Sequence, residues 1–128
     1  IIESRNIGET YNVGGNTEIA NLDLVNLLCE ELDKKFASNK TLTKRFPLSA
    51  PANSKKSKNL IYYVEDRLGH DLRYAINASK IISDLNFKPK VKFAEGISKT
   101  IDWYLDNESW LRLISSDNHK EWINKHYK

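Results

Sequence analysis

The residues best suited to chemistry lie in one short run of this sequence. The run reads Asp66-Arg67-Leu68-Gly69-His70-Asp71. The planar guanidinium of Arg67 offers a fork of donors that matches phosphate oxygens, and Gly69 lets the backbone approach a ligand closely. His70 can donate a further hydrogen bond to an anion or to a ribose. The run therefore predicts an anion-binding loop. A surface loop with internal ion pairs, in which Asp66 and Asp71 hold Arg67 and Arg73, is the open alternative.

Asn21 is a second candidate, for a different reason. It stands immediately before an apolar pattern of helical spacing, where an N-cap belongs. The start of a helix also presents free N–H groups and the positive end of the helix dipole, which favour an anion. The two roles are compatible, so we expect Asn21 both to cap a helix and to lie near a ligand.

Motifs for catalysis, cofactor binding or metal binding are missing from this sequence. Gly14-Gly15 does not belong to a G-x-G-x-x-G string, no Tyr is followed four residues later by Lys, and no Ser stands in G-x-S-x-G. His70, His119 and His126 have no metal-ligand spacing, and the single Cys29 cannot complete a site. We expect this chain by itself to hold no catalytic residue, no cofactor and no metal.

Short strands and several helices must position the candidate loop. The β-prone runs at 10–13, 60–64 and 74–76 predict strands, the second of them buried. Apolar residues at helical spacing predict helices over 22–36, 78–85 and 93–105, with further helical turns over 107–114 and near Trp122. Asn77 should cap the second helix, and Trp103, Tyr104 and Trp110 should lie in the core or in a helix contact. The expected fold class is α+β.

A basic stretch from Ala37 to Lys58 interrupts this pattern. It carries Pro47, Pro51 and a group of cations without any acidic residue: Lys40, Lys44, Arg45, Lys55, Lys56 and Lys58. This composition predicts a solvated, mobile loop that is dispensable to the fold. No aromatic residues alternate with the charges to stack on bases, so we do not expect nucleic-acid binding.

Length and composition set the outer limits. The 128 residues suffice for one domain, and 40% apolar with 29% charged residues is ordinary for a soluble globular chain. No apolar run approaches the roughly 20 residues that span a bilayer, and the first residues do not form a signal peptide. The lone Cys29 indicates a buried structural thiol and a reducing cytoplasm. The absence of any Met suggests a fragment of a longer protein.

Several phrases, in this order, resemble those of dTDP-glucose 4,6-dehydratases, which are extended short-chain dehydrogenases/reductases. The phrases are Gly8-Glu9-Thr10-Tyr11-Asn12-Val13-Gly14-Gly15, Asn21-Leu22-Asp23, Tyr63 to Asp71 with Arg73-Tyr74-Ala75-Ile76, and Lys99 to Leu105 with Trp110. They cover nearly the whole chain except the basic stretch. Leu68 stands where the family usually has Pro, Leu72 where it often has Arg, and Asn77 where it usually has Asp. The first change loosens the loop, and the second removes a positive charge near the implied phosphate site.

The resemblance implies that the chain is the small carboxy-terminal α+β domain that binds the nucleotide sugar. The substrate contacts it implies are Asn21, Asp66, Arg67, Leu68, Gly69, His70 and Tyr127. A separate amino-terminal Rossmann domain would bind NAD and carry the catalytic residues, and the intact enzyme would be a homodimer.

The implied activity is that of a lyase. NAD takes a hydride from C4 of dTDP-glucose, water is lost across C5 and C6, and the hydride returns to C6. The product, dTDP-4-keto-6-deoxyglucose, is a precursor of deoxysugars such as rhamnose. The same part of a related nucleotide-sugar epimerase or decarboxylase, or a stand-alone nucleotide-sugar-binding module, are the alternatives.

Overall fold

A computed structural model describes residues 7–65, 68–69 and 73–114 of the chain. The regular elements of this part are five α-helices and two 3-10 turns. They are α1 (Asn21–Ser38), α2 (Lys40–Arg45), η1 (Pro51–Asn53), η2 (Ser57–Leu60), α3 (Ser79–Leu85), α4 (Phe93–Asp106) and α5 (Glu108–Ile114). None of these helices is long and apolar enough to cross a bilayer.

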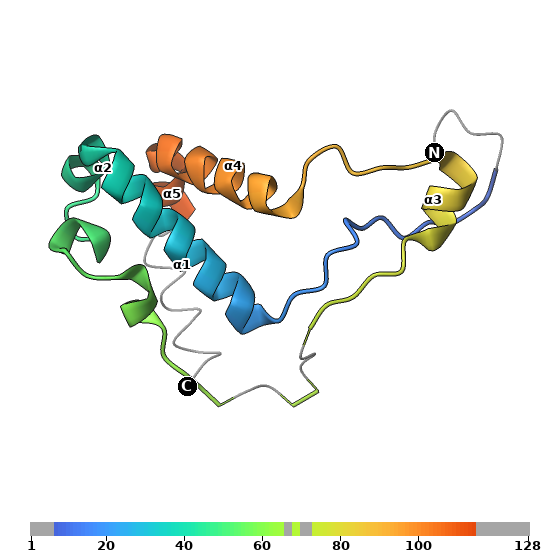
Figure 1. The fold of residues 1–128 in the computed structure, drawn as a ribbon, viewed down its shortest axis with the longest axis horizontal. Helices are drawn as coiled ribbons and strands as arrows, with labels where there is room; N and C mark the ends of the chain where they lie inside the picture. The colour runs from blue at the N-terminus through green and yellow to red at the C-terminus, as the bar shows by residue number, and fades with distance from the viewer. Residues whose placement is uncertain (1–6, 66–67, 70–72, 115–128) are drawn as a thin grey trace.

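All of these elements except α3 gather into one body, which we call the helical lobe (Figure 1). Within it α1 contacts α2, α4 and both 3-10 turns, and α5 contacts α4. The third helix stands apart and is joined to the lobe by long extended segments (Figure 1). The buried apolar side chains divide in the same way. Phe36, Leu42, Ala50 and Ile101 lie in the helical lobe, and Ala78 and Ile81 lie in or beside α3.

The predicted helix over 22–36 is confirmed by α1, but its cap differs from the prediction. The helix begins at Asn21, and Ala20 is the N-cap residue, with extended φ and ψ of −67° and 147°. The carbonyl of Ala20 accepts the first helical hydrogen bond, from the N–H of Leu24 at 3.0 Å. Asn21 is therefore the first helical residue and not the cap. The N-cap residue, Ala20, makes no side-chain cap bond.

The helices predicted over 78–85, 93–105 and 107–114 are confirmed by α3, α4 and α5 within one residue at each end. Asn77 supports the start of α3 from one position before its N-cap residue. Its side-chain oxygen accepts from the N–H of Ser79 at 3.0 Å and from the hydroxyl at 2.6 Å. Asn86 ends α3 in the left-handed region, with φ 54°. The turn predicted near Trp122 lies outside the described residues.

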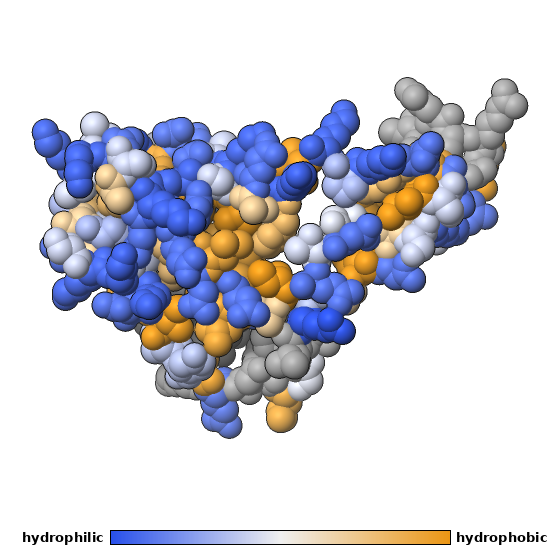
Figure 2. Space-filling model, in the orientation of Figure 1, coloured by the Kyte–Doolittle hydropathy of each residue, from blue (hydrophilic) through white to orange (hydrophobic). Residues whose placement is uncertain are grey.

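The aromatic residues of α4 and α5 form the predicted helix contact. The rings of Trp103 and Trp110 meet edge to face with centroids 5.1 Å apart, and Tyr104 lies 5.7 Å from Trp110. Between α1 and α4 the helical lobe keeps an apolar hollow of about 240 Å³, lined by Leu28, Cys29, Leu32, Ile101, Tyr104 and Leu105. Figure 2 shows apolar surface in the middle of the molecule, between these two helices.

The three predicted strands are wrong for the described residues, whose architecture is mostly helical and contains no strand. Segments 10–13 and 74–76 are extended and approach each other closely, since a Cβ on Gly14 would lie 3.3 Å from the side chain of Ile76. Even so, one isolated antiparallel bridge, between Ala20 and Arg73, is the only strand-like pairing in this part of the chain. Segment 60–64 starts at the end of η2 and is not buried. Local β propensity does not form a strand unless a neighbouring strand completes the hydrogen bonds.

The prediction that residues 37–58 form a loop is also wrong, because α2, η1 and η2 occupy much of this segment. Leu42, Ala50 and Ser57 are buried. The carboxylate of Asp33 in α1 accepts from both the N–H and the hydroxyl of Ser57, at 3.0 and 2.7 Å, which fixes η2 to α1. The lysines lie on the surface of these short helices, so their charge does not prevent packing beneath them. Whether the segment is dispensable is tested by the leucine variants described in the Discussion.

Candidate ligand-binding site

Leu68 and Gly69 are the described part of the predicted anion-binding loop, and they form a turn. Gly69 has φ +74°, a left-handed conformation that a side chain would strain. Leu68 is fully exposed. Asp66, Arg67, His70 and Asp71 lie outside the described residues, as does Tyr127 at the end of the chain. Their proposed ligand contacts therefore stay predictions.

Arg73 ties the exit of this loop to the segment that leads into α1. Its backbone forms the antiparallel bridge with Ala20, and its guanidinium donates to the Glu18 carboxylate at 2.5 Å. Because Ala20 immediately precedes Asn21, the bridge places the first turn of α1 beside the point where the loop ends. Asn21 thus lies next to the bridge to Arg73, the first described residue after the loop, although the sequence separates the two widely. Among the described residues Arg73 pairs with Glu18, and its pairing with Asp66 or Asp71, considered from the sequence, stays a prediction.

Two features make the start of α1 suited to an anion. Its N-cap residue, Ala20, makes no side-chain cap bond to the first N–H groups, and the helix is long enough, at 18 residues, to carry a full dipole. Next to the bridge, an open hollow of about 640 Å³ lies between the two extended segments and is lined by Asn16, Glu18, Ala75, Ile76, Asn77 and Ala78. The described geometry therefore places the start of α1 and the adjacent hollow beside Arg73, where the chain leaves the predicted loop.

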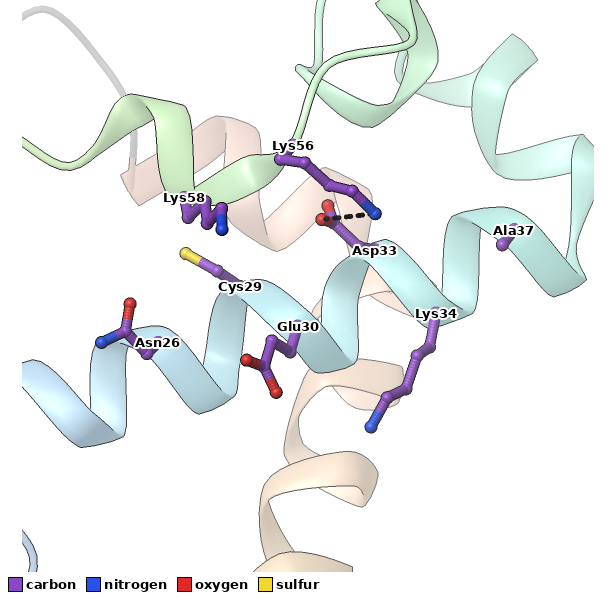
Figure 3. Close-up of a pocket in the computed structure, with 8 residues that line it drawn as sticks. All are labelled: Asn26, Cys29, Glu30, Asp33, Lys34, Ala37, Lys56 and Lys58. Carbon is purple, nitrogen blue, oxygen red and sulfur yellow. Dashed lines mark ion pairs between the residues drawn. The ribbon is translucent and has the colours of Figure 1, made fainter.

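A second hollow, of about 420 Å³, lies along the middle of α1 (Figure 3). It is lined by Asn26, Cys29, Glu30, Asp33, Lys34, Ala37, Lys56 and Lys58. Cys29 is half-buried here, less than predicted. Two causes raise the pKa of its thiol above the ordinary value: first its partial burial, and second the negative charge of the nearby Asp33. A thiol with a raised pKa is mostly protonated at neutral pH and is a weak nucleophile. None of the predicted ligand contacts that the structure describes lines this hollow.

No metal site is found in the described residues, where no group of three or more His, Cys, Asp or Glu side chains could hold an ion. The three histidines, His70, His119 and His126, all lie outside that part of the chain.

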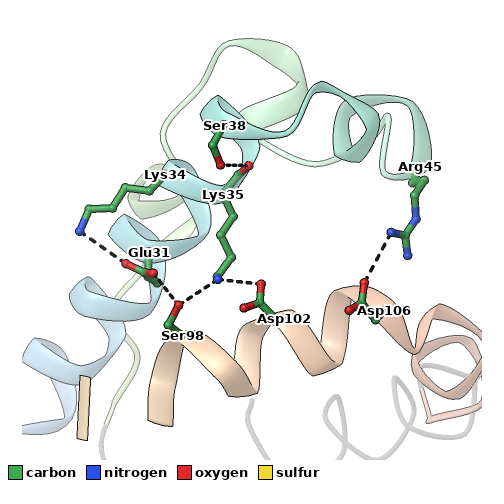
Figure 4. A network of polar contacts seen from close by, with 8 residues as sticks. All are labelled: Glu31, Lys34, Lys35, Ser38, Arg45, Ser98, Asp102 and Asp106. Carbon is green, nitrogen blue, oxygen red and sulfur yellow. Dashed lines mark hydrogen bonds and ion pairs between the residues drawn. The ribbon is translucent and has the colours of Figure 1, made fainter. Parts of the chain in front are cut away.

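A polar bridge locks α1 onto α4 and so fixes the helix whose first turn belongs to the site (Figure 4). Lys35 pairs with Asp102 at 2.7 Å and donates to the hydroxyl of Ser98 at 2.9 Å. That hydroxyl in turn donates to the carboxylate of Glu31 at 2.9 Å. The hydrogen bond from Ser98, followed by the attraction of Lys34 and Lys35, holds the pKa of Glu31 below 4.5 against an opposing desolvation effect.

Ser98→Ala should therefore raise the pKa of the Glu31 carboxyl. A pKa lowered in the folded state gives stability that is present above the unfolded value of 4.5 and is lost as the pH falls through the folded pKa. The variant should lose part of this acid-sensitive stability. Carboxyl ¹³C NMR titration measures the pKa directly, and Ser83→Ala, whose hydroxyl contacts Lys80 and Asp84 instead, is the control. An unchanged Glu31 pKa in Ser98→Ala would contradict the assigned cause.

Two features of the site could not be found from the sequence, namely the Ala20–Arg73 bridge and the Glu18–Arg73 ion pair. The members of the ion pair are 55 positions apart. No periodicity or motif links residues at such a separation.

Comparison with known proteins identifies the family of the chain. The family model described as GDP-mannose 4,6 dehydratase matches residues 4–100, which include Asn21 and the whole 66–71 loop. The chain is 37% identical over 128 residues to a dTDP-glucose 4,6-dehydratase of Shigella flexneri, covering 100% of this chain and 31% of that relative. It is 45% identical over 107 residues to one from Escherichia coli (84% of this chain, 26% of the relative). For one from Neisseria meningitidis serogroup B the identity is 39% over 114 residues (89% and 29%). The chain thus spans under a third of the length of these relatives.

Proposed function

The chain belongs to the GDP-mannose 4,6 dehydratase family, and from this premise we propose that it is the nucleotide-sugar-binding part of a dTDP-glucose 4,6-dehydratase. The resemblance predicted from the sequence is confirmed by the family match and by the similar relatives. The names of these relatives support dTDP-glucose as the substrate of the longer protein. The proposed reaction converts dTDP-glucose to dTDP-4-keto-6-deoxyglucose and water, which makes the enzyme a lyase.

The observation that carries the proposal is the bridge between Ala20 and Arg73. It pairs the residue before α1 with Arg73, four positions after Gly69, so the backbone N–H donors at the start of α1 lie beside the chain that leaves the loop. A nucleotide sugar carries a diphosphate that needs such donors. We propose that Asn21, Asp66, Leu68 and Gly69 shape this site, that Arg67 and His70 bind the diphosphate, and that Tyr127 closes over the ligand.

In this proposal the NAD cofactor binds to another part of the longer polypeptide. The described residues do not fit NAD, because Gly14-Gly15 is not followed by a helix and Ile76 already occupies the space at Gly14. We propose that a Rossmann domain in the longer polypeptide binds NAD and carries the catalytic residues. The present chain would bind and orient the sugar nucleotide, as an α+β domain whose extended segments form short strands in the intact enzyme. We further propose a homodimer in the cytoplasm.

A product analysis tests the proposal. The longer polypeptide should convert dTDP-glucose, with NAD, to a product that has lost one water, whereas this chain alone should show no turnover and no NAD binding. Mass spectrometry separates the alternatives, since an epimerase leaves the mass unchanged and a decarboxylase acts on an acidic sugar with loss of carbon dioxide. GDP-mannose and UDP-glucose are the control substrates. Preferred turnover of either control would overturn the assigned nucleotide, and turnover by this chain alone would overturn the division of roles.

A further inference from the structure

The apolar segment at 60–64, which leads into the candidate loop, is largely exposed in the described structure. Leu60, Tyr62, Tyr63 and Val64 are 68%, 80%, 81% and 63% exposed. In an extended chain successive side chains point to opposite faces, so the adjacent Tyr62 and Tyr63 leave apolar surface on both sides of the segment. An apolar run of this kind is typical of a strand that is buried on both faces.

The backbone groups of this segment also largely lack hydrogen-bond partners within the described residues. Past Leu60, which ends η2, the one backbone hydrogen bond of residues 61–64 within the described part joins the N–H of Ile61 to the carbonyl of Lys58 at 3.1 Å. The N–H and C=O groups of residues 62–64 have no backbone partner in that part of the chain. Such groups are available to pair with another strand.

The segment also lacks the protection that solvent-exposed edges carry. Exposed edge strands usually contain Lys, Pro or a bulge that prevents pairing. Residues 60–64 contain neither a charge nor a proline, and the nearest charges are Lys58 and Glu65, outside both ends. The segment is therefore suited to an apolar partner rather than to water.

We infer that residues 60–64 are a docking strand, which another part of the same longer polypeptide pairs with and covers on both faces. Two observations identify this occupant. The chain accounts for 31% of the length of its relative, so most of such a polypeptide is available to supply the partner strand. Val64 also lies two positions before Asp66, so docking here would hold the ligand loop against the part that carries the chemistry. The inference rests on the proposed function only in that the chain is part of a longer protein.

Hydrogen exchange on the intact longer protein, without substrate or added cofactor, tests this inference. The amides of residues 61–64 should exchange on the order of 100-fold more slowly than in an unfolded peptide, because they would be paired and covered. The exposed linker at residues 88–91 serves as an internal reference and should exchange fast. Protection should be the same at two protein concentrations. Fast exchange at 61–64 would overturn the inference, and so would protection that rises with concentration, because the occupant would then be a second copy.

A pair of lysine substitutions gives a second, matched measurement. Tyr63→Lys should speed exchange at residues 61–64 by about tenfold or more, because a charge cannot be covered on both faces. Val91→Lys, at a partly exposed apolar residue in a linker, should leave that exchange unchanged. Equal effects of the two variants would overturn the docking strand. Protection without dehydratase turnover would instead leave it standing and refute the proposed function.

Discussion

Leu42→Ala should lower the free energy of unfolding by about 2–5 kcal/mol, whereas Leu48→Ala should change it by less than about 0.5 kcal/mol. Both leucines belong to the basic 37–58 segment and both lose the same atoms. Leu42 is 4% exposed and Leu48 is 96% exposed. The difference between the variants therefore reports burial alone.

The large effect is expected because Leu42 lies where the basic segment packs against α1. In this region the rings of Phe36 in α1 and Phe46 at the end of α2 lie 6.4 Å apart. Asn39 caps α2 by accepting from the N–H of Thr41 at 3.0 Å, which holds the short helix in place. Removing the Leu42 side chain leaves a cavity that these fixed neighbours cannot easily fill.

Urea unfolding followed by the helical circular dichroism signal measures both variants. If Leu42→Ala proved as neutral as Leu48→Ala, the 37–58 segment would be mobile and dispensable, as its composition alone suggests. A large loss for both would mean that Leu48 is buried in solution.

The helices could be predicted from the sequence because their determinants are local. In α1, apolar residues recur every three or four positions, and Asp23 and Lys35 stand at the ends that the helix dipole favours. The limits of α3 follow from Asn77 and Asn86, which are adjacent to it. Each of these signals lies within a few residues of the element that it defines.

The predictions of the strands and of the basic loop failed for two different physical reasons. A strand needs hydrogen bonds from a distant part of the chain, so the run at 60–64 remains open where no partner strand is present. The basic segment was judged by its average composition. Its packing depends on a few particular residues, namely Leu42, Ala50 and Ser57, which an average conceals.

The sequence proposes the residues of the candidate site, whose ligand contacts stay predictions, but it does not give the tertiary contact beside them. Gly69 was expected to let the backbone approach a ligand closely, which stays a prediction, and the structure adds that its φ is +74°, in the left-handed region. The antiparallel contact that brings Ala20 to Arg73 depends on tertiary structure. The single sequence therefore proposes two separate anion-favouring elements, and the structure adds the bridge that pairs the start of one with the residue after the other.

Arg67→Ala should raise the KM of the intact enzyme for dTDP-glucose by about 10- to 100-fold. The guanidinium fork can make two charge-assisted hydrogen bonds to the diphosphate, worth roughly 1.5–3 kcal/mol in a partly desolvated site. Because the diphosphate is remote from the reacting sugar carbons, most of this energy should be uniform binding and should leave kcat less affected. Some loss of kcat is also expected, since remote binding energy helps to orient the sugar.

Two further arginine variants make the measurement specific. Arg67→Lys should restore only part of the affinity, because a point charge cannot reproduce bidentate geometry. Arg112→Ala is the control, since Arg112 is an exposed arginine of α5 that pairs with Glu108. It should leave KM unchanged. The competing interpretation is that Arg67 pairs with Asp66 or Asp71 on the surface, where an ion pair contributes less than about 1 kcal/mol to stability and nothing to binding. Steady-state kinetics and melting temperatures of the three variants separate the two, and an unchanged KM in Arg67→Ala would make the loop structural.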